Sequence, residues 1–373
     1  MKQIIYADNA ATTQLDMGAF EAMVPYLLNE YGNASQPYSF SRKPKQALAD
    51  ARETIAKCIN AKPNEIYFTS GGTESDNWAI KSTALFGLSN KSIVTSAIEH
   101  HAVINACKAL ERQGHLVYFV QPDDKGVILP EKLDHSLPFD AKLVSIMFSN
   151  NEIGTIEPIK DLVNISHKKN ALFHTDAVQA VGHVHIDVQE LGVDMLSASA
   201  HKFNGPKGVG FLYVREGVSL TPLLDGGAQE RGHRASTENI ASIVGMAAAL
   251  KSNVDRIGMT TTYLLSLEKR LLSGIAELDF VRNGSENHVP GTISLSFRKA
   301  DGEALLHRLD LKGIMISTGA ACDSIHTNLS HVIKAIHVPD DYAKGTIRIS
   351  FGKNNTEDEV DKIIAALLEI VKQ

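Results

Sequence analysis

The sequence contains few of the residues that mark several classes of protein. Its three cysteines, Cys58, Cys107 and Cys322, are too few and too far apart for a disulfide framework or a metal-binding knuckle. No apolar run approaches the roughly 20 residues of a membrane span. At a formal net charge of −6, Lys and Arg form no cluster suited to a phosphate backbone. The opening MKQIIYADNAATT lacks the features of a secretory signal. We therefore expect a cytoplasmic protein that binds neither membranes nor nucleic acid directly.

The chain has the composition of an ordinary globular protein, with 43% hydrophobic and 21% charged residues in a total of 373. Its first half alternates short β-branched runs with longer helical patterns. The predicted strands span 65–70, 92–96, 115–120, 141–148, 171–176, 194–199 and 209–214. This alternation predicts an α/β fold in which a mainly parallel seven-stranded sheet lies between helices.

The second half has a different pattern. Residues 236–277 are mostly helical and suit a connector. Beyond them, predicted strands alternate with predicted helices in a smaller α+β arrangement. The strands are 292–297, 313–318 and 345–351, and the helices are 301–312, 327–337 and 357–371. We predict a large domain over 16–255 and a small C-terminal domain, completed by the first residues, over 1–15 and 256–373.

Polar residues follow five of the predicted strands of the large sheet. They are Thr73, His100, Asn151, Asp176 and Lys202. In parallel sheets, ligands bind at the carboxyl ends of the strands, so we expect these side chains to lie near one another.

The stretch TSGGTESDN (69–77) places two glycines between a strand and a helix. Glycines let the backbone approach an anion, and the free N–H groups of the first helical turn can bind a phosphate. Asp76 stands three residues after Thr73, as the partner in a capping box does. The alternative interpretation is a capped helix without a ligand.

The other strand-end residues each have two interpretations. Asp176 can hold a pyridinium nitrogen, or it can cap the next helix. His100 can stack on a flat ring and Asn151 can donate to a phenolate oxygen, or both can be turn residues. Lys202, before a Gly/Pro loop, can form a Schiff base or remain a surface lysine. Taken together, these residues describe the protein side of a pyridoxal phosphate site.

The sequence resembles the cysteine desulfurases, which are pyridoxal-phosphate enzymes of fold type I in the class V aminotransferase group. The matching blocks run almost from end to end. They are DNAATT (8–13), YGN (31–33), TSGGTESDN (69–77), EHHAV (99–103), NNEIG (150–154), HTDAVQ (174–179), SASAHKFNGPKGVG (197–210), GGAQERGHRASTEN (226–239), STGAAC (317–322) and TIRISFGK (346–353).

The resemblance implies a cofactor, pyridoxal 5'-phosphate, and roles for individual residues. Lys202 would bind the cofactor covalently and move protons, His100 would stack on its ring, and Asp176 would pair with its ring nitrogen. The other cofactor-binding residues would be Gly72, Thr73, Asn151, Gln179, Ser199, His201 and, from a neighbouring subunit of a homodimer, Thr237. The substrate carboxylate would bind Arg348 in a pocket also lined by Asn33, Ala11 and Thr12.

The implied reaction converts L-cysteine to L-alanine. The sulfur would pass as a persulfide to Cys322, which must react as a thiolate, and then to an acceptor protein such as an iron–sulfur scaffold or a tRNA-thiolation enzyme. The chain departs from the family pattern at some positions: Ala34 stands where Pro is usual, and Ala235-Ser236 stand where Ser-Gly is usual.

Three alternatives to this activity stay open. The chain could be a selenocysteine lyase, a class V aminotransferase that needs no Cys322, or a sulfur-relay protein that has lost catalysis. The presence of Lys202, Asp176, His100 and Arg348 argues against the last of these. A metal site is not expected, because the alternating histidines near residue 185 have no cysteine partner.

Overall fold

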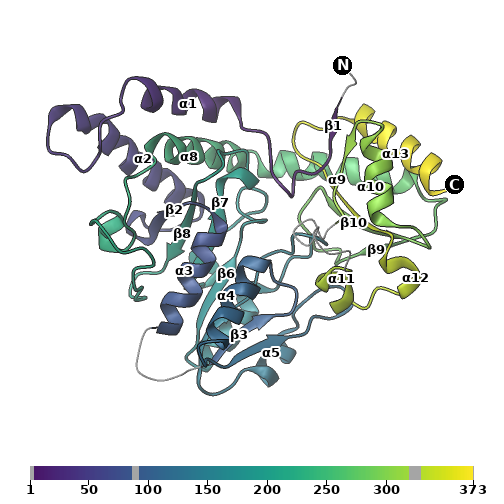
Figure 1. The fold of residues 1–373 in the computed structure, drawn as a ribbon, viewed down its shortest axis with the longest axis horizontal. Helices are drawn as coiled ribbons and strands as arrows, with labels where there is room; N and C mark the ends of the chain where they lie inside the picture. The colour runs from purple at the N-terminus through teal and green to yellow at the C-terminus, as the bar shows by residue number, and fades with distance from the viewer. Residues whose placement is uncertain (1–3, 86–91, 319–328, 373) are drawn as a thin grey trace.

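A computed structural model describes residues 4–85, 92–318 and 329–372, and its centre is a seven-stranded sheet (Figure 1). In spatial order the strands are β2 (Ile66–Thr69), β8 (Gly210–Val214), β7 (Met195–Ser199), β6 (Leu172–Asp176), β5 (Ala141–Ser145), β3 (Ser92–Ser96) and β4 (Val117–Val120). The five strands from β7 to β4 are parallel, while β8 runs antiparallel to both of its neighbours. The predicted α/β architecture with a mainly parallel sheet is confirmed.

Helices cover both faces of this sheet because successive side chains of a strand point in opposite directions. On β8, Phe211 and Tyr213 join one hydrophobic cluster, whereas Leu212 and Val214 join another. The first cluster includes side chains of α1 (Met17–Leu28), α2 (Arg42–Cys58), α5 (Pro130–Ser136), α6 (Ile159–Lys168), α7 (Val188–Leu191) and α8 (Ile240–Val254), and the second those of α3 (Gly72–Leu85) and α4 (His101–Glu111).

A second hydrophobic core joins the start of the chain to its last third. Ile5 and Ala7 are buried in one cluster with residues between 264 and 370. The elements of this region, on the right in Figure 1, are β1 (Ile5–Tyr6), α9 (Ile257–Gly274), β9 (Phe280–Asn283), β10 (Thr292–Phe297), α10 (Gly302–Asp310), β11 (Ile314–Met315), α11 (His331–Ala335), α12 (Asp340–Ala343), β12 (Thr346–Ser350) and α13 (Glu357–Val371). Strand β10 pairs antiparallel with β9 and β12, and β1 pairs parallel with β11. No helix in the described ranges is long and apolar enough to cross a bilayer.

The structure differs from the prediction mainly in this second region. Strand β9 was not predicted, because its four residues show no alternation and it forms by pairing with β10. The strand expected over 313–318 is limited to Ile314–Met315. Helix α11 begins only after Ser330, whose side chain accepts hydrogen bonds from the Val332 and Ile333 amides and so caps the helix.

Residues 7–16 connect the two cores. The Asn9 amide donates to the Ser350 carbonyl at 3.1 Å on one side, and the Thr13 amide donates to the His201 carbonyl at 2.9 Å on the other. The segment therefore spans from β12 to the turn after β7. Its carbonyl groups lie where the strands of the large sheet end.

A half-buried histidine, His288, connects α9 to the loop over 284–291. His288 donates from Nδ1 to the Glu286 carbonyl at 2.7 Å and from Nε2 to Glu268 at 2.8 Å. Burial and Arg282 lower the pKa of His288, but the hydrogen bonds and the charge of Glu268 outweigh them, so the net pKa is raised. The same loop pairs with Thr155, near the end of the NNEIG segment. In its protonated form, His288 therefore links α9 to a loop next to the strand ends.

We expect stability to fall as pH rises above the ordinary histidine value of 6.5 and through the raised pKa of folded His288. The loss should be about 1 kcal/mol, the net value of a typical intramolecular hydrogen bond, because solvent at this partly exposed site weakens the charged pair. His288→Gln should lack this slope in thermal unfolding measured from pH 6 to 9. The exposed His337, paired with Asp124, provides the control His337→Gln, which should keep the slope. An identical slope in both variants would contradict the assignment.

Candidate active site

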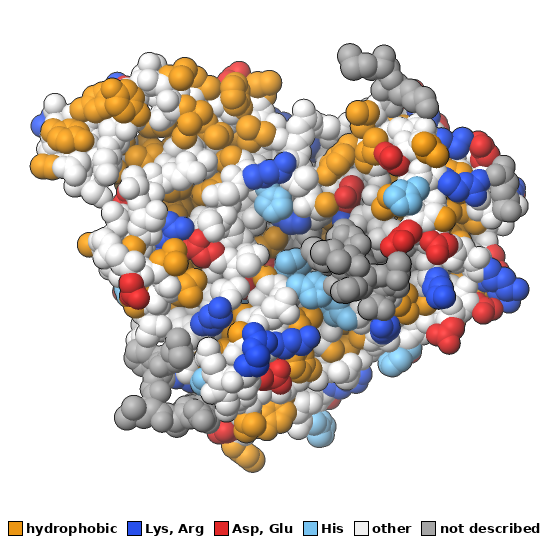
Figure 2. Space-filling view, in the orientation of Figure 1, with side chains coloured by type: hydrophobic (Ala, Val, Ile, Leu, Met, Phe, Trp, Pro, Cys, Tyr) orange, Lys and Arg blue, Asp and Glu red, His pale blue; other side chains and the backbone are white. Residues whose placement is uncertain are grey.

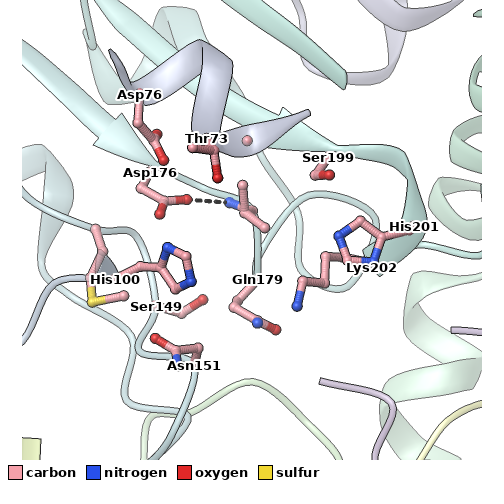
Figure 3. A pocket seen from close by; sticks show the side chains of 13 residues that line it. Thr73, Asp76, His100, Ser149, Asn151, Asp176, Gln179, Ser199, His201 and Lys202 are labelled. Carbon is pink, nitrogen blue, oxygen red and sulfur yellow. Dashed lines mark hydrogen bonds between the residues drawn. The ribbon is translucent and has the colours of Figure 1, made fainter. Parts of the chain in front are cut away.

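A pocket of about 170 Å³ lies at the carboxyl ends of the large sheet's strands (Figure 3). Its lining is Gly72, Thr73, Asp76, His100, Met147, Ser149, Asn151, Asp176, Val178, Gln179, Ser199, His201 and Lys202. Every residue predicted to bind the cofactor, with the exception of Thr237, is among them. The described residues contain no group of His, Cys, Asp or Glu arranged to hold a metal ion.

Lys202 enters the pocket from a single 3-10 turn that follows β7. Its Nζ donates to the Ala10 carbonyl at 2.6 Å and to the Ala11 carbonyl at 2.8 Å. The Gln179 amide also donates to the Ala10 carbonyl, at 3.0 Å. Behind the lysine, His183 Nε2 donates to the Lys202 carbonyl at 2.8 Å. Backbone and side chain are thus both fixed, and the ammonium lies at one side of the pocket.

The other end of the pocket is formed by the first turn of α3. A Cβ on Gly72 would come within 2.5 Å of the Val178 side chain, so this close approach requires glycine. The predicted capping pair of Thr73 and Asp76 is wrong, because α3 already begins at Gly72. Glu74 takes the capping role instead and accepts a hydrogen bond from the Ser70 amide at 2.8 Å. Asp76 turns into the pocket.

His100 caps helix α4 with its ring. Nδ1 accepts a hydrogen bond from the Ala102 amide at 3.2 Å, so the ring proton must be on Nε2. Burial lowers the pKa of His100; Asp176 opposes this effect and Lys202 adds to it. The imidazole is therefore neutral at physiological pH and offers an N–H donor.

Asp176 is the last residue of β6 and faces His100 (Figure 3). Its carboxylate accepts a hydrogen bond from the Val178 amide at 2.9 Å. Burial raises the pKa of Asp176, whereas His100, the Val178 amide and Lys202 lower it. A carboxylate with so little water around it is stable only beside a positive charge.

Arg348, on β12, lies beside the pocket and is 3% exposed. It donates to the Asn151 carbonyl at 2.7 Å and to Asp8 at 2.6 Å, and its Nε finds no acceptor in the described part of the chain. On the opposite side, the Thr12 hydroxyl contacts His201 Nδ1 at 3.1 Å. Burial, with Lys202 and Lys207, lowers the pKa of His201 to about 4.

Two predicted residues in the described part of the chain lie away from this pocket. Asn33 accepts a hydrogen bond from the Ser35 amide at 2.9 Å and is not part of the lining. Thr237 is exposed in a separate hollow beside Ser236. Ser236 has φ of +99°, a region that favours the glycine usual in the family and strains a serine by about 1 kcal/mol. Cys322 lies outside the described residues.

The prediction missed four lining residues: Asp76, Met147, Ser149 and Val178. Asp76 had a signal in the sequence, because positions four apart share one helix face and Gly72 already pointed to the pocket. Met147 and Ser149 precede Asn151 in the segment that follows β5. The position of Val178 became evident only from its contact with Gly72.

The chain belongs to the class-V aminotransferase family, whose sequence profile matches residues 5–363. It is 44% identical over 379 positions to a cysteine desulfurase IscS of Clostridium botulinum, covering 100% of this chain and 96% of that protein. It is 45% identical over 372 positions to the cysteine desulfurase IscS of Methanosarcina thermophila, covering 99% and 92%. A solved structure titled NifS-like protein superposes with a TM-score of 0.94 at 39% identity, covering 99% of this chain and 100% of that one. The predicted family is confirmed, and with it fold type I.

Proposed function

We propose that this chain is a cysteine desulfurase that converts L-cysteine to L-alanine and transfers the sulfur to Cys322 as a persulfide. The observation that carries the proposal is the arrangement of the pocket. Lys202 lies at one side, the buried Asp176 and the neutral His100 at the other, and the glycine turn of α3 at one end. Full-length similarity to named cysteine desulfurases supports the substrate.

The residues that line the pocket suit pyridoxal 5'-phosphate. The first turn of α3, with Thr73, Ser199 and His201, suits a phosphate group. Burial raises the pKa of Asp176, and a pyridinium nitrogen beside it would add a positive charge that stabilises the carboxylate. His100 would lie against the ring, and Asn151 and Gln179 would reach its phenolic oxygen. When bound, the cofactor supplies an electron sink for the α carbon of the amino acid.

The side chains around the substrate would then have separate tasks. Lys202 Nζ, once it has lost a proton, removes the α proton of cysteine and later returns one. His100 donates from Nε2, because the Ala102 amide occupies Nδ1. Arg348 would bind the substrate carboxylate, and its buried Nε is the guanidinium nitrogen without an acceptor among the described residues.

Of the three cysteines, Cys322 is the one that we assign to sulfur transfer. Its thiolate attacks the sulfur of the substrate; an S–S bond forms, the C–S bond breaks, and the electron pair stays with the carbon skeleton, which takes up a proton to become alanine. Burial raises the pKa of the Cys58 thiol to about 11 and that of Cys107 to about 12, so both remain protonated. A sulfur-acceptor protein, an iron–sulfur scaffold or a thiolation enzyme, would then take the persulfide sulfur.

We also propose a homodimer, with domains over 16–255 and over 1–15 with 256–373. Thr237 is exposed and outside the pocket of its own chain, as a residue that completes a partner's site should be. An apolar patch covers α1 and the following loop, at the upper left of Figure 2. Its exposed members are Met17, Phe20, Leu27, Leu28, Tyr31, Tyr38 and Phe40. Patches of this kind mark protein interfaces.

Light scattering should give twice the chain mass of 40.5 kDa. Phe20→Glu, within the apolar patch, should shift the population toward monomer and weaken cofactor binding, because each site would lose a partner's Thr237. Leu311→Glu is the control: Leu311 is also exposed, at 74% against 46% for Phe20, but lies in the second core's region, at the end of α10. A wild-type monomer, or equal dissociation by both variants, would contradict the proposed dimer.

The direct test of the activity is an assay of purified protein, loaded with pyridoxal phosphate, on L-cysteine. We expect equal amounts of alanine and of sulfur, the latter released as sulfide when a thiol reductant is present. Selenocysteine and an α-keto acid acceptor should be compared in parallel. A strong preference for selenocysteine, or transfer of the amino group in place of alanine formation, would reject the proposed reaction.

A further inference from the structure

The pocket contains a second buried acid, Asp76, to which the proposed function gives no role. It lies four residues after Gly72 on α3, is 1% exposed and lines the same pocket as Asp176. Figure 3 shows the two carboxyl groups side by side at one end of the pocket. Two acids in so small a volume raise the question of which of them carries the charge.

Within the described residues, the one basic side chain in ion-pair range of Asp76 is His174. Its Nε2 is 3.7 Å from Asp76 Oδ1, which is too long for a hydrogen bond. His174 is occupied by the Ser145 and Ser197 hydroxyls at 2.8 and 2.9 Å. Burial lowers the pKa of His174 to about 3, so the ring is neutral.

The carboxyl oxygens of Asp76 also have few hydrogen-bond donors around them. Oδ1 has no hydrogen-bond partner in the described chain, and the Ser197 hydroxyl of β7 is the one side-chain donor that lowers its pKa. Burial, Asp176 and then Glu99, which follows β3, raise the pKa of Asp76 well above its ordinary value. An ionised carboxylate here would be buried, unpaired and next to another acid.

Asp176 is the better place for a negative charge. Its carboxylate accepts a hydrogen bond from the Val178 amide, and the Lys202 ammonium stabilises its ionised form. Two neighbouring carboxylates in a site with little water repel each other, so one of the two acids binds a proton. The acid with fewer hydrogen-bond donors is the one that becomes protonated. That acid is Asp76.

We propose that Asp76 holds a proton at neutral pH and, by staying neutral, leaves Asp176 as the one carboxylate that faces the cofactor's ring nitrogen. Asp76 is then a positioning residue: it acts on the charge of Asp176 and takes part in no chemical step. Its role toward the cofactor rests on the proposed function, whereas its protonation does not.

Infrared spectroscopy of the apoprotein tests the protonation directly. With ¹³C-labelled aspartate, the carbonyl band of a protonated aspartic acid is separated from the bands of Glu99 and Glu157. We expect such a band at pH 7 in the wild type and its loss in Asp76→Asn. In Asp176→Asn the band should disappear at lower pH than in the wild type, because the repelling charge is gone. A spectrum at pH 7 that Asp76→Asn leaves unchanged overturns the proposal.

Thermal unfolding gives a second measurement. Between the ordinary aspartate value of 3.8 and the raised pKa, folded Asp76 keeps a proton that the unfolded chain releases, so wild-type stability falls as pH rises. The melting temperature of Asp76→Asn relative to wild type should therefore increase from pH 4 to 7, by about 2 °C or more. A constant or decreasing difference overturns the proposal.

Should Asp76→Asn fail to fold, Ser197→Ala keeps the infrared test decisive. Removal of the hydroxyl that contacts Asp76 should shift the frequency of the protonated band, and an absent or unshifted band overturns the proposal. Neither cofactor nor cysteine enters these measurements. A negative result in these measurements would therefore not contradict the desulfurase activity. A negative cysteine assay would likewise not contradict the protonation of Asp76.

Discussion

Lys202→Ala should lower the turnover of L-cysteine by at least about 10³-fold, the range expected when a positioned proton-transfer group is lost. The Nζ of Lys202 is the one lysine amine in the pocket lining, held toward it by the Ala10 and Ala11 carbonyls. No other lining residue offers an amine for covalent attachment of an aldehyde. We therefore expect both the catalytic proton transfers and the stable yellow colour of the loaded protein to be lost.

The measurements are alanine formation, the absorption spectrum after incubation with pyridoxal phosphate, and mass spectrometry after borohydride treatment. In the wild type, borohydride should leave the cofactor attached to the peptide that contains Lys202. Lys207→Ala is the matched control, since Lys207 is exposed in the same Gly/Pro loop. Attachment at another lysine, or near-normal turnover by Lys202→Ala, would refute the assignment.

Cys322→Ala should abolish the transfer of sulfur while leaving the cofactor bound and the colour intact. A methyl group cannot attack the sulfur of cysteine, so neither persulfide nor sulfide should form above background. The rate of sulfur transfer should fall by more than about 10²-fold, because neither of the other two thiols is activated as a nucleophile. Burial raises the pKa of the Cys58 thiol to about 11 and that of Cys107 to about 12, so their thiolate fractions at neutral pH are small.

The matched control is Cys58→Ala, which removes a half-buried thiol from α2 and should retain sulfur release. Trapping of the persulfide with an alkylating reagent, followed by peptide mass analysis, identifies the sulfur that carries it. Undiminished sulfide from Cys322→Ala would eliminate the persulfide route. A modified Cys58 peptide would move the route to another cysteine.

The sheet and the set of residues that line the pocket could be predicted, because both depend on patterns within short stretches of sequence. Each buried strand ends at the same edge, so a polar residue after each strand places His100, Asn151, Asp176 and Lys202 around one hollow. The strand periodicity is strong where β-branched residues are buried on both sides. The family and the fold are confirmed by the comparisons, whereas the roles of these residues stay predictions.

What the sequence could not reveal depends on contacts between distant segments. The acceptors of Lys202 are backbone carbonyls of Ala10 and Ala11, and any residue type presents such carbonyls. The tautomer of His100 depends on the hydrogen bond that its Nδ1 accepts from the Ala102 amide. From the sequence, a role as a turn residue was only one of two interpretations of His100. Asp76 was assigned to the helix terminus, although its burial beside Asp176 becomes evident only when α3 is packed on the sheet.

The stretch that runs from β12 to the turn after β7 makes the chain sensitive to shortening at its amino end. Deleting residues up to 15 would remove β1, which pairs with β11, and would take Ile5 and Ala7 out of the second core. It would also take away both carbonyl partners of the Lys202 ammonium. A truncated protein would therefore lose the contacts that position the Lys202 ammonium and part of the second core. An affinity tag should be added to either end of the full chain and should not replace its first 15 residues.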